Sequence, residues 1–402
     1  MFTDSKKPDK NSLDENAVKK TSTLWDRPFI FLNLSFFLVF NSIAFLYLYP
    51  LALEGMGNGH HIIGLVMGIF SLAAVISRPF VGKLIVSRGE YRVISLGMAT
   101  NIVSSLSYCL VTDFGPVMLL VRLIHGVGFS AFIGGSFSLA ARAFPPDDRG
   151  QAFGVVGASI MCAVALAPPL GEFLISRWGF HALYMAASGS VILAWVAAFL
   201  ATHPPSPSRQ SDKQTDIKYL ALFRDRSFLY LLGSTVIFSH CQSTVPNFLA
   251  LIAAEKGATS GRFFFVAHVV AIIILLTMGK LIDRHGKVLF LRLAYPFLLL
   301  GILFIPVMIQ SNFFSLSAIL YGVGIGFLFP AHNALAAGHG SNMEKPAFMS
   351  FFTAVYDSGF ITGAILSGWF ASQTSLDTLF FACVFLGLIG IYIVIASPIK
   401  ER

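Results

Sequence analysis

Long apolar runs recur twelve times along this chain of 402 residues and constrain its fold more than any other feature. A helix of about 20 apolar residues crosses the hydrocarbon core of a bilayer, whereas barrel strands alternate in polarity over about ten residues. Only 12% of the residues are charged, compared with about a quarter in a typical soluble domain. The sequence therefore predicts an all-α integral membrane protein with twelve transmembrane helices near residues 28–53, 61–81, 93–112, 116–142, 151–175, 180–202, 228–252, 262–281, 289–309, 313–337, 347–371 and 376–398.

Lysine and arginine gather on one side of the predicted spans, in the tail and turns near residues 1–27, 82–92, 142–149 and 280–292. The other side offers only Arg177, Lys256 and Arg262. Because positive charge stays cytoplasmic in short loops, we expect a multi-pass protein of the cell (inner) membrane with both termini in the cytoplasm. The net charge of +8 then reflects topology, and we expect no nucleic-acid partner.

One phrase occurs twice, at residues 82–89 and again 197 positions later at 279–286. Residues 125–128 and 152–153 have counterparts at nearly the same offset, at 321–324 and 347–348. A repeat of half the chain length predicts two six-helix bundles with a seam between them, as in a carrier. The expected units are a cytoplasmic tail at 1–27, bundles at 28–202 and 227–398, a cytoplasmic Pro- and Ser-rich linker at 203–226, and a tail at 399–402.

Together these residues resemble the major facilitator superfamily, and within it the twelve-span drug:proton antiporters and their sugar-efflux-like relatives. The resemblance covers essentially residues 25 to 399. The family's loop motif appears in the second half as Gly279, Asp283, Arg284 and Gly286. The first-half copy keeps Gly82, Arg88 and Gly89 but has Val86 and Ser87 where the family usually has Asp and Arg.

The resemblance implies the major facilitator fold, two pseudo-symmetric six-helix bundles, with a cytoplasmic latch formed by the loop motif. The motif's glycines permit a tight turn, and its carboxylate can cap a helix or accept a bond from arginine. The first copy is then the weaker latch, or one rebuilt by Arg88, Glu90 and Arg92. The alternative is that the side chains other than glycine form ordinary basic turns.

Two further segments resemble family motifs. Residues 119–128 in span four are similar to the motif whose buried arginine, here Arg122, is tied to proton coupling. Span five is similar to the antiporter motif, although Glu172 stands where a second glycine is usual; the matching positions include Gly157, Pro168, Pro169 and Gly171. Proline and glycine there allow a bend where the two halves meet. This resemblance favours export over uptake.

Ionisable groups within the membrane are costly and are functional candidates by default. Asp357 lies about 16 Å into span eleven, near the midplane of a core about 30 Å thick. A carboxyl group there can take up and release a proton as its surroundings change; the alternative is a permanent hydrogen bond to neighbours such as Tyr356 or Ser358. Arg122 lies about 9 Å inside span four, where we expect a functional or gating role rather than snorkelling outward.

Polar residues at mid-membrane in spans one and seven could contact substrate, because the resemblance implies that spans one, four, seven and ten line a central cavity. These residues are Asn41, Ser42, His240 and Gln242, and Tyr356 is added from span eleven. The imidazole of His240 titrates near neutral pH, so it also joins Asp357 and Arg122 as a candidate for proton coupling. Amide bonds between helices are an alternative role for Asn41 and Gln242.

His332 and Asn333 follow a proline near the cytoplasmic end of span ten. They could gate the inner mouth of the cavity, or meet headgroups and water. We expect His268 to be a packing residue, Glu172 to lie near the outer interface, and Arg78 to snorkel to the cytoplasmic surface.

The sequence offers no support for an enzyme. The four cysteines lie inside apolar spans without paired spacing, and no phosphate loop, Ser-His-Asp order or metal-ligand cluster stands out. We expect no cofactor and no metal site.

The resulting hypothesis is a secondary active transporter, expected as a monomer in the lipid bilayer, that exchanges protons for a small amphiphilic organic molecule by alternating access. Proton-coupled uptake of a small metabolite is the alternative. A membrane sensor or scaffold that does not transport is a remote third.

Overall fold

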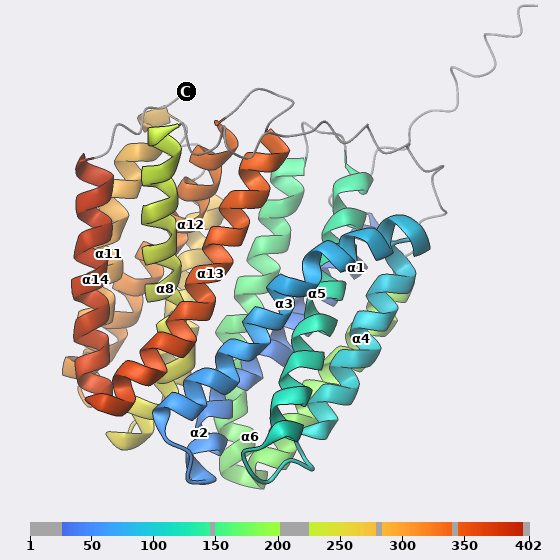
Figure 1. Cartoon of the computed structure of the whole chain (residues 1–402), viewed down its shortest axis with the longest axis horizontal. Coiled ribbons are helices and arrows are strands. Elements are labelled where there is room, and N and C mark those ends of the chain that lie inside the picture. The colour runs from blue at the N-terminus through green and yellow to red at the C-terminus, as the bar shows by residue number, and fades with distance from the viewer. Residues whose placement is uncertain (1–25, 145–148, 202–224, 279–283, 340–344, 397–402) are drawn as a thin grey trace, which may run out of the picture.

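The computed structural model describes residues 26–144, 149–201, 225–278, 284–339 and 345–396, and within this part all regular structure is helical (Figure 1). The predicted all-α class is thereby confirmed. The helices are α1 (Arg27–Phe45), η2 (Leu46–Leu48), α2 (Tyr49–Gly55), α3 (His60–Arg88), α4 (Glu90–Ser107), α5 (Pro116–Ala143), α6 (Arg149–Leu200), α8 (Arg226–Glu255), α9 (Gly261–Thr277), α11 (Lys287–Met308), α12 (Phe314–Ala337), α13 (Lys345–Gln373) and α14 (Leu376–Ala396).

Nine helical stretches among the described residues are long and apolar enough to cross a membrane. The 52 residues of α6 would span about 78 Å as a straight helix, far more than a bilayer. The backbone of α6 leaves the helical region at Gly179, where φ is 76°. Because glycine adopts this conformation without steric cost, α6 turns back on itself there. The expected linker at 203–226 lies almost entirely outside the described residues.

The repeat detected in the sequence is also a repeat of backbone geometry. We call the end of the molecule at which α2 meets α3 the lower end and the opposite end the upper end, as oriented in Figure 1. Glycines with positive φ turn the chain at the lower end, at Gly57 and Gly257, and at the upper end, at Gly89 and Gly286. Each pair is separated by half the chain, so both halves turn at equivalent places.

Equivalent helix crossings occur in the two halves. Gly126 on α5 lies against the carbonyl oxygen of Phe70 on α3, with no room for a Cβ atom. Gly322 on α12 lies in the same way against the carbonyl oxygen of Ala267 on α9. Residues 70 and 126 correspond to 267 and 322 at offsets of 197 and 196, so the duplication predicted from short motifs extends to contacts between helices.

Most helix packing joins elements from the same half of the chain, for example α1 with α6 and α11 with α12. The two halves meet chiefly where α3 packs against α13 and where α6 packs against α9. Figure 1 shows α3 and α13 together near the lower end and separating toward the upper end. Near the lower end, Gly64 lies against Gly368 so closely that a Cβ atom on Gly64 would be 2.9 Å from the Gly368 Cα atom.

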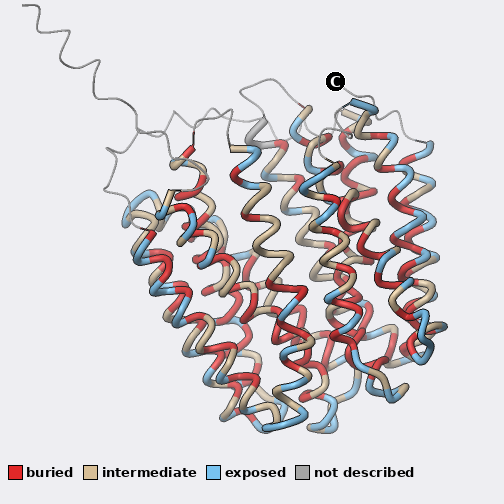
Figure 2. The backbone as a smooth tube through the Cα atoms, turned by 180° about the vertical axis from the view of Figure 1, so that it is seen from behind, coloured by how far each residue is buried: buried red, intermediate tan, exposed pale blue. Residues whose placement is uncertain are grey.

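Buried residues line the sides of the helices that face other helices, and exposed residues lie on the outside (Figure 2). The exposed residues include many large apolar side chains, such as Phe199, Phe385 and Leu110. A soluble protein would hide such side chains, whereas lipid solvates them.

Candidate functional site

Asp357 on α13 forms an ion pair with Arg78 on α3, and this contact joins the two halves of the chain. The Asp357 side chain is 16% exposed and that of Arg78 is 40% exposed. Arg78 comes directly before Pro79 inside α3. The expectation that Arg78 snorkels to the cytoplasmic surface is wrong, because its guanidinium group is bonded to a carboxylate on the other half of the chain. This partner is 279 residues away in the chain, and no local pattern indicates it.

Next to Asp357, Tyr356 donates a hydrogen bond from its hydroxyl group to Oε1 of Gln242 on α8 (2.8 Å). The main-chain carbonyl of Gln242 accepts a second hydrogen bond from the Tyr321 hydroxyl on α12 (3.2 Å). The rings of Phe329 and Phe360 lie 5.1 and 5.3 Å from the Tyr356 ring, centroid to centroid. The structure therefore brings together two of the predicted cavity residues, Gln242 and Tyr356, in an aromatic setting beside the carboxylate.

His240 on α8 packs against α13, the helix that carries Asp357, but it lies farther toward the lower end than Asp357. Its Nδ1 atom is 3.2 Å from the Thr362 hydroxyl and its Nε2 atom is 3.4 Å from the Ser367 hydroxyl. These partners lie 5 and 10 residues beyond Asp357 on α13, and no contact between His240 and Asp357 is formed. His240 belongs to the interface between α8 and α13.

Arg122 occupies a separate buried site within the first half, near the lower end. Its guanidinium group stacks over the Tyr49 ring at 4.7 Å, contacts the Met67 sulfur and lies 3.4 Å from the Tyr108 hydroxyl. The Tyr108 hydroxyl also lies 2.9 Å from Nδ1 of His125. Arg122 is only 2% exposed, so aromatic faces replace the water that it would need. Asp357, the other main candidate for proton coupling, is not among these contacts of Arg122.

Sequence reasoning missed the tyrosines around Arg122. Tyr49 is the first residue of α2 and Tyr108 is the C-cap residue of α4, and both side chains are buried. Their approach to Arg122 depends on tertiary packing. Nε of Arg122 and Nε2 of His125 have no hydrogen-bond partner among the described residues.

The other predicted cavity residues are dispersed. Asn41 is buried and accepts a hydrogen bond from Ser190 on α6 (3.3 Å), whereas the hydroxyl of Ser42 is buried without a partner among the described groups. His332 is fully buried, stacks on Phe238 with centroids 5.3 Å apart and lies 2.9 Å from the Ser234 hydroxyl.

The expectation that His332 could meet headgroups and water is therefore wrong, since neighbouring helices enclose its ring. The adjacent Asn333 is exposed. His268 lies 2.9 Å from the Phe264 carbonyl and is a packing residue, as expected.

The loop motif is only partly described. Gly82 lies inside α3, is exposed and has open space around it, so the turn expected there is wrong. The turn occurs at Gly89, with φ at 82°, and at Gly286, with φ at 98°. Arg88 and Arg284 are exposed; the expected latch residues Gly279 and Asp283 lie outside the described residues.

Glu90, one of the residues with which the first latch could be rebuilt, bonds to two residues of α5. It pairs with Arg142 at 3.0 Å and accepts a hydrogen bond from Ser138 at 3.1 Å. These contacts hold the start of α4 against the end of α5, within the first half.

The span-five motif lies along α6 at the contact with α9. The backbone of α6 stays helical through Pro168 and Pro169, and the non-helical residue within α6 is Gly179, which lies between the predicted spans five and six. Gly171 packs closely against Leu48: a Cβ atom added to Gly171 would lie 2.7 Å from a Cδ atom of Leu48. A Cβ atom added to Gly157 would lie 3.4 Å from a Cδ atom of Leu275, an ordinary van der Waals distance.

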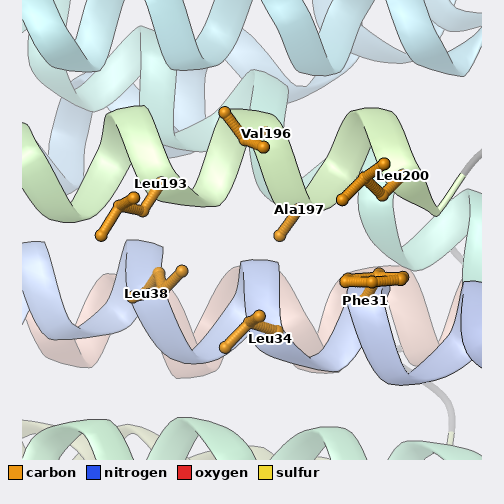
Figure 3. Close-up of a pocket in the computed structure, with 7 residues that line it drawn as sticks. All are labelled: Phe31, Leu34, Leu38, Leu193, Val196, Ala197 and Leu200. Atoms are coloured by element: carbon orange, nitrogen blue, oxygen red, sulfur yellow. The ribbon is translucent and has the colours of Figure 1, made fainter.

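An apolar groove of about 320 Å³ lies on the outside between α1 and the second part of α6 (Figure 3). Figure 3 shows that only hydrocarbon side chains line it: Phe31, Leu34, Leu38, Leu193, Val196, Ala197 and Leu200. None of the predicted site residues belongs to this groove. The candidate site is therefore the polar and aromatic group around Asp357.

Comparison with known proteins agrees with this geometry. The sequence model of the family described as Major Facilitator Superfamily matches residues 29–312 and 258–401. Multidrug resistance protein MdtG of Proteus mirabilis is 23% identical over 88% of this chain and 91% of its own length. Quinolone resistance protein NorA of Staphylococcus aureus is 23% identical over 81% of each chain.

A solved structure has the same fold. The crystal structure of nucleoside transporter NupG superimposes with a TM-score of 0.76 at 14% identity, covering 93% of this chain and 100% of NupG.

Proposed function

The chain belongs to the major facilitator superfamily, and we propose that it is a secondary active transporter that exports a small amphiphilic organic molecule in exchange for protons. The similarity to relatives named for multidrug and quinolone resistance supports efflux. The ion pair between Asp357 and Arg78 is the observation that carries the proposed coupling.

We propose twelve spans in two pseudo-symmetric bundles of six, at 28–202 and 227–398, joined by a cytoplasmic linker at 203–226. Nine helical stretches qualify by length and hydropathy, and α6 turns back at Gly179 and so counts twice. Adding the less apolar α4 and the shorter α9 brings the number to twelve. Basic residues at helix ends on the upper side, such as Arg88, Arg149 and Lys287, support an orientation with that end and both termini in the cytoplasm of a cell with an inner membrane.

In this orientation the lower end faces outside, and the close glycine contacts there support a conformation that is shut to the outside. Alternating access requires the two bundles to rock, so that contacts near the lower end open as those near the upper end close. The loop motif at the upper end, with Asp283 and Arg284, is then expected to latch the opposite conformation.

Asp357 and Arg78 lie on the two helices that separate toward the upper end, so their ion pair spans the seam. When Asp357 takes up a proton, its carboxyl group loses the charge that holds Arg78. The halves then lose one attraction, and the conformational equilibrium shifts. The effect is reciprocal, because movement of the halves must change the affinity of Asp357 for protons by the same factor.

Tyr356, Gln242, Phe329 and Phe360 form the proposed substrate surface next to Asp357. Aromatic faces bind apolar and weakly cationic groups, and Gln242 offers hydrogen bonds that fix orientation. Arg122 and His240 do not contact Asp357, so we assign them a supporting role in coupling, with Asp357 and Arg78 central.

Purified protein in vesicles with an imposed pH gradient tests the proposal. A fluorescent amphiphilic dye of the kind used for efflux assays should move against its gradient only when protons flow the other way. Asp357→Asn should abolish this coupled movement. Asp377→Asn is the matched control, because that carboxylate pairs with Lys256 within the second half at 2.6 Å. Unchanged coupling in Asp357→Asn would remove Asp357 from the mechanism.

The same vesicles separate export from uptake. An antiporter drives substrate opposite to the proton flow, whereas a symporter drives both in one direction. The fold is shared with a protein named as a nucleoside transporter, so a nucleoside should be tested beside the dye. Absence of gradient-driven flux for every compound that raises the melting temperature would favour the sensor or scaffold hypothesis.

A further inference from the structure

Glu172 on α6 caps the beginning of α9, which belongs to the other half of the chain. Its Oε1 atom accepts hydrogen bonds from the main-chain N–H groups of Ser260 (2.6 Å) and Gly261 (3.0 Å), and from the Ser260 hydroxyl (2.8 Å). The first N–H groups of a helix have no partner within it, and this end carries partial positive charge. Ser260, the N-cap residue, makes no capping bond with its own side chain. The cap therefore comes from across the seam.

The main chains of α6 and α9 also touch at this point. A Cβ atom on Gly261 would lie 2.6 Å from the Pro169 Cα atom and 2.6 Å from Oε2 of Glu172. Such distances are well inside van der Waals contact, so only glycine allows the approach. Glu172 and Gly261 thus depend on each other: the glycine lets the helices meet, and the carboxylate bonds across the contact.

The other seam at the lower end has a different chemistry. There Gly64 on α3 meets Ala364 and Gly368 on α13 backbone against backbone, and Gly68 lies against the Ile365 side chain, so the groups in contact carry no charge. Contacts of this kind give shape complementarity but little directional bonding. Of these two seams at the lower end, the one between α6 and α9 is held by a carboxylate.

We propose that Glu172 is a positioning residue that sets how often the lower end opens. All three hydrogen bonds to its carboxylate must break when α6 leaves α9, and charge-assisted hydrogen bonds are about twice as strong as neutral ones. Glu172 acts through the position of α9 and touches neither the proposed substrate surface nor Asp357. This inference rests on the alternating-access part of the proposed function, and its test uses neither substrate nor a pH gradient.

Distances between paired spin labels measure the opening directly. Arg177→Cys and Asn312→Cys place exposed labels on the two halves at the lower end. Val86→Cys and Arg284→Cys do the same at the upper end. The partly buried native cysteines, Cys109 and Cys162, are first replaced by alanine.

Glu172→Ala should raise the ratio of lower-open to lower-closed molecules by about tenfold, a factor equivalent to about 1.4 kcal/mol. The lower pair should then show a longer distance and the upper pair a shorter one. Gly261→Ala should cause the same shift, because it separates the helices while keeping the carboxylate. Glu172→Gln should fall between, since its carbonyl oxygen still accepts hydrogen bonds but carries no full charge. Glu54→Ala, an exposed carboxylate at the same end whose partner His60 is in its own half, should leave both distances unchanged.

The proposal is overturned if Glu172→Ala and Gly261→Ala both keep the parent distances, or if Glu54→Ala shifts them equally. If Glu172→Ala does not fold, Gly261→Ala and Glu172→Gln decide the matter. A shift of the labels without gradient-driven transport would support the role of Glu172 and count only against the proposed function. Coupled transport with unshifted labels would refute the role of Glu172 alone.

Discussion

Arg78 and Asp357 lie 279 residues apart in the chain and form an ion pair between α3 and α13. Neither residue has a charged counterpart in the repeat. At an offset of 197, Arg78 corresponds to Leu275, and at an offset of 195, Asp357 corresponds to Cys162. The duplicated architecture therefore carries a polar contact between α3 and α13 and apolar residues at the equivalent place between α6 and α9. The asymmetry points to a specialised function for the polar one.

We expect Asp357→Asn and Arg78→Gln each to lower the free energy of unfolding by about 1–3 kcal/mol. This range lies between that of an exposed pair and that of a buried one, because Arg78 is partly exposed. The doubly exchanged protein, with Arg78→Asp and Asp357→Arg, should recover part of this loss while remaining inactive in coupled transport. Thermal unfolding in detergent measures the first effect and vesicle flux the second. Additive losses without recovery in the exchanged protein would show that the two side chains do not stabilise each other.

Helix crossings should be sensitive to one added methyl group. Gly126→Ala and Gly322→Ala place a Cβ atom against a backbone carbonyl in each half, so we expect each to destabilise the protein by about 1–3 kcal/mol. Gly154→Ala is the control, because nothing lies within 4 Å of that position in α6, and alanine favours a helix by up to about 1 kcal/mol over glycine. Melting temperatures should fall for the first two and stay level or rise for the third. Equal behaviour of all three would contradict the crossing geometry.

The buried tyrosines around Arg122 should differ in importance. Tyr108→Phe removes the hydroxyl that lies between Arg122 and Nδ1 of His125, and unpaired buried groups cost about 1–3 kcal/mol. Tyr49→Phe should be nearly neutral, because the Tyr49 hydroxyl has no partner among the described residues and its ring still faces the guanidinium. Denaturation of the two variants side by side provides the measurement. A larger loss in Tyr49→Phe would mean that its hydroxyl has a partner, such as a buried water molecule.

The two glycines of the first-half loop motif should also differ. Gly89 has φ at 82° and ψ at 157°, a conformation that residues with a Cβ atom avoid, so Gly89→Ala should cost about 1–3 kcal/mol. Gly82 is helical and has open space around it, so Gly82→Ala should keep full stability. Unfolding midpoints distinguish the two. Comparable losses at both positions would indicate that Gly82 needs its small size in a contact formed in another conformation.

Much of the fold could be predicted from local pattern. Apolar runs located the helices because each must satisfy its own backbone hydrogen bonds in lipid, a requirement that depends only on nearby residues. The boundaries were less accurate. The run ending near residue 81 continues as helix to Arg88, because exposed polar residues such as Lys83 extend a helix into water without penalty.

The candidate site was harder to predict. Asp357, Tyr356 and Gln242 were singled out by depth in the membrane, and two of them bond to each other. A family motif groups Arg122 with Asp357, and mid-membrane depth and an imidazole group add His240, but the structure separates all three. Depth along a helix can be counted from sequence, but the direction in which a side chain points depends on how that helix rotates against its neighbours.

The sequence by itself determined the membrane class, the duplication and the positions of most spans, because these follow from hydropathy and spacing within one stretch of chain. Only the tertiary structure decided which charges meet. Arg78 reaches Asp357, and Glu172 reaches the start of α9, across a seam between segments 88 to 279 residues apart. Ion pairs and helix caps act over a few ångströms, and such distances between remote residues exist only once the two halves have packed together.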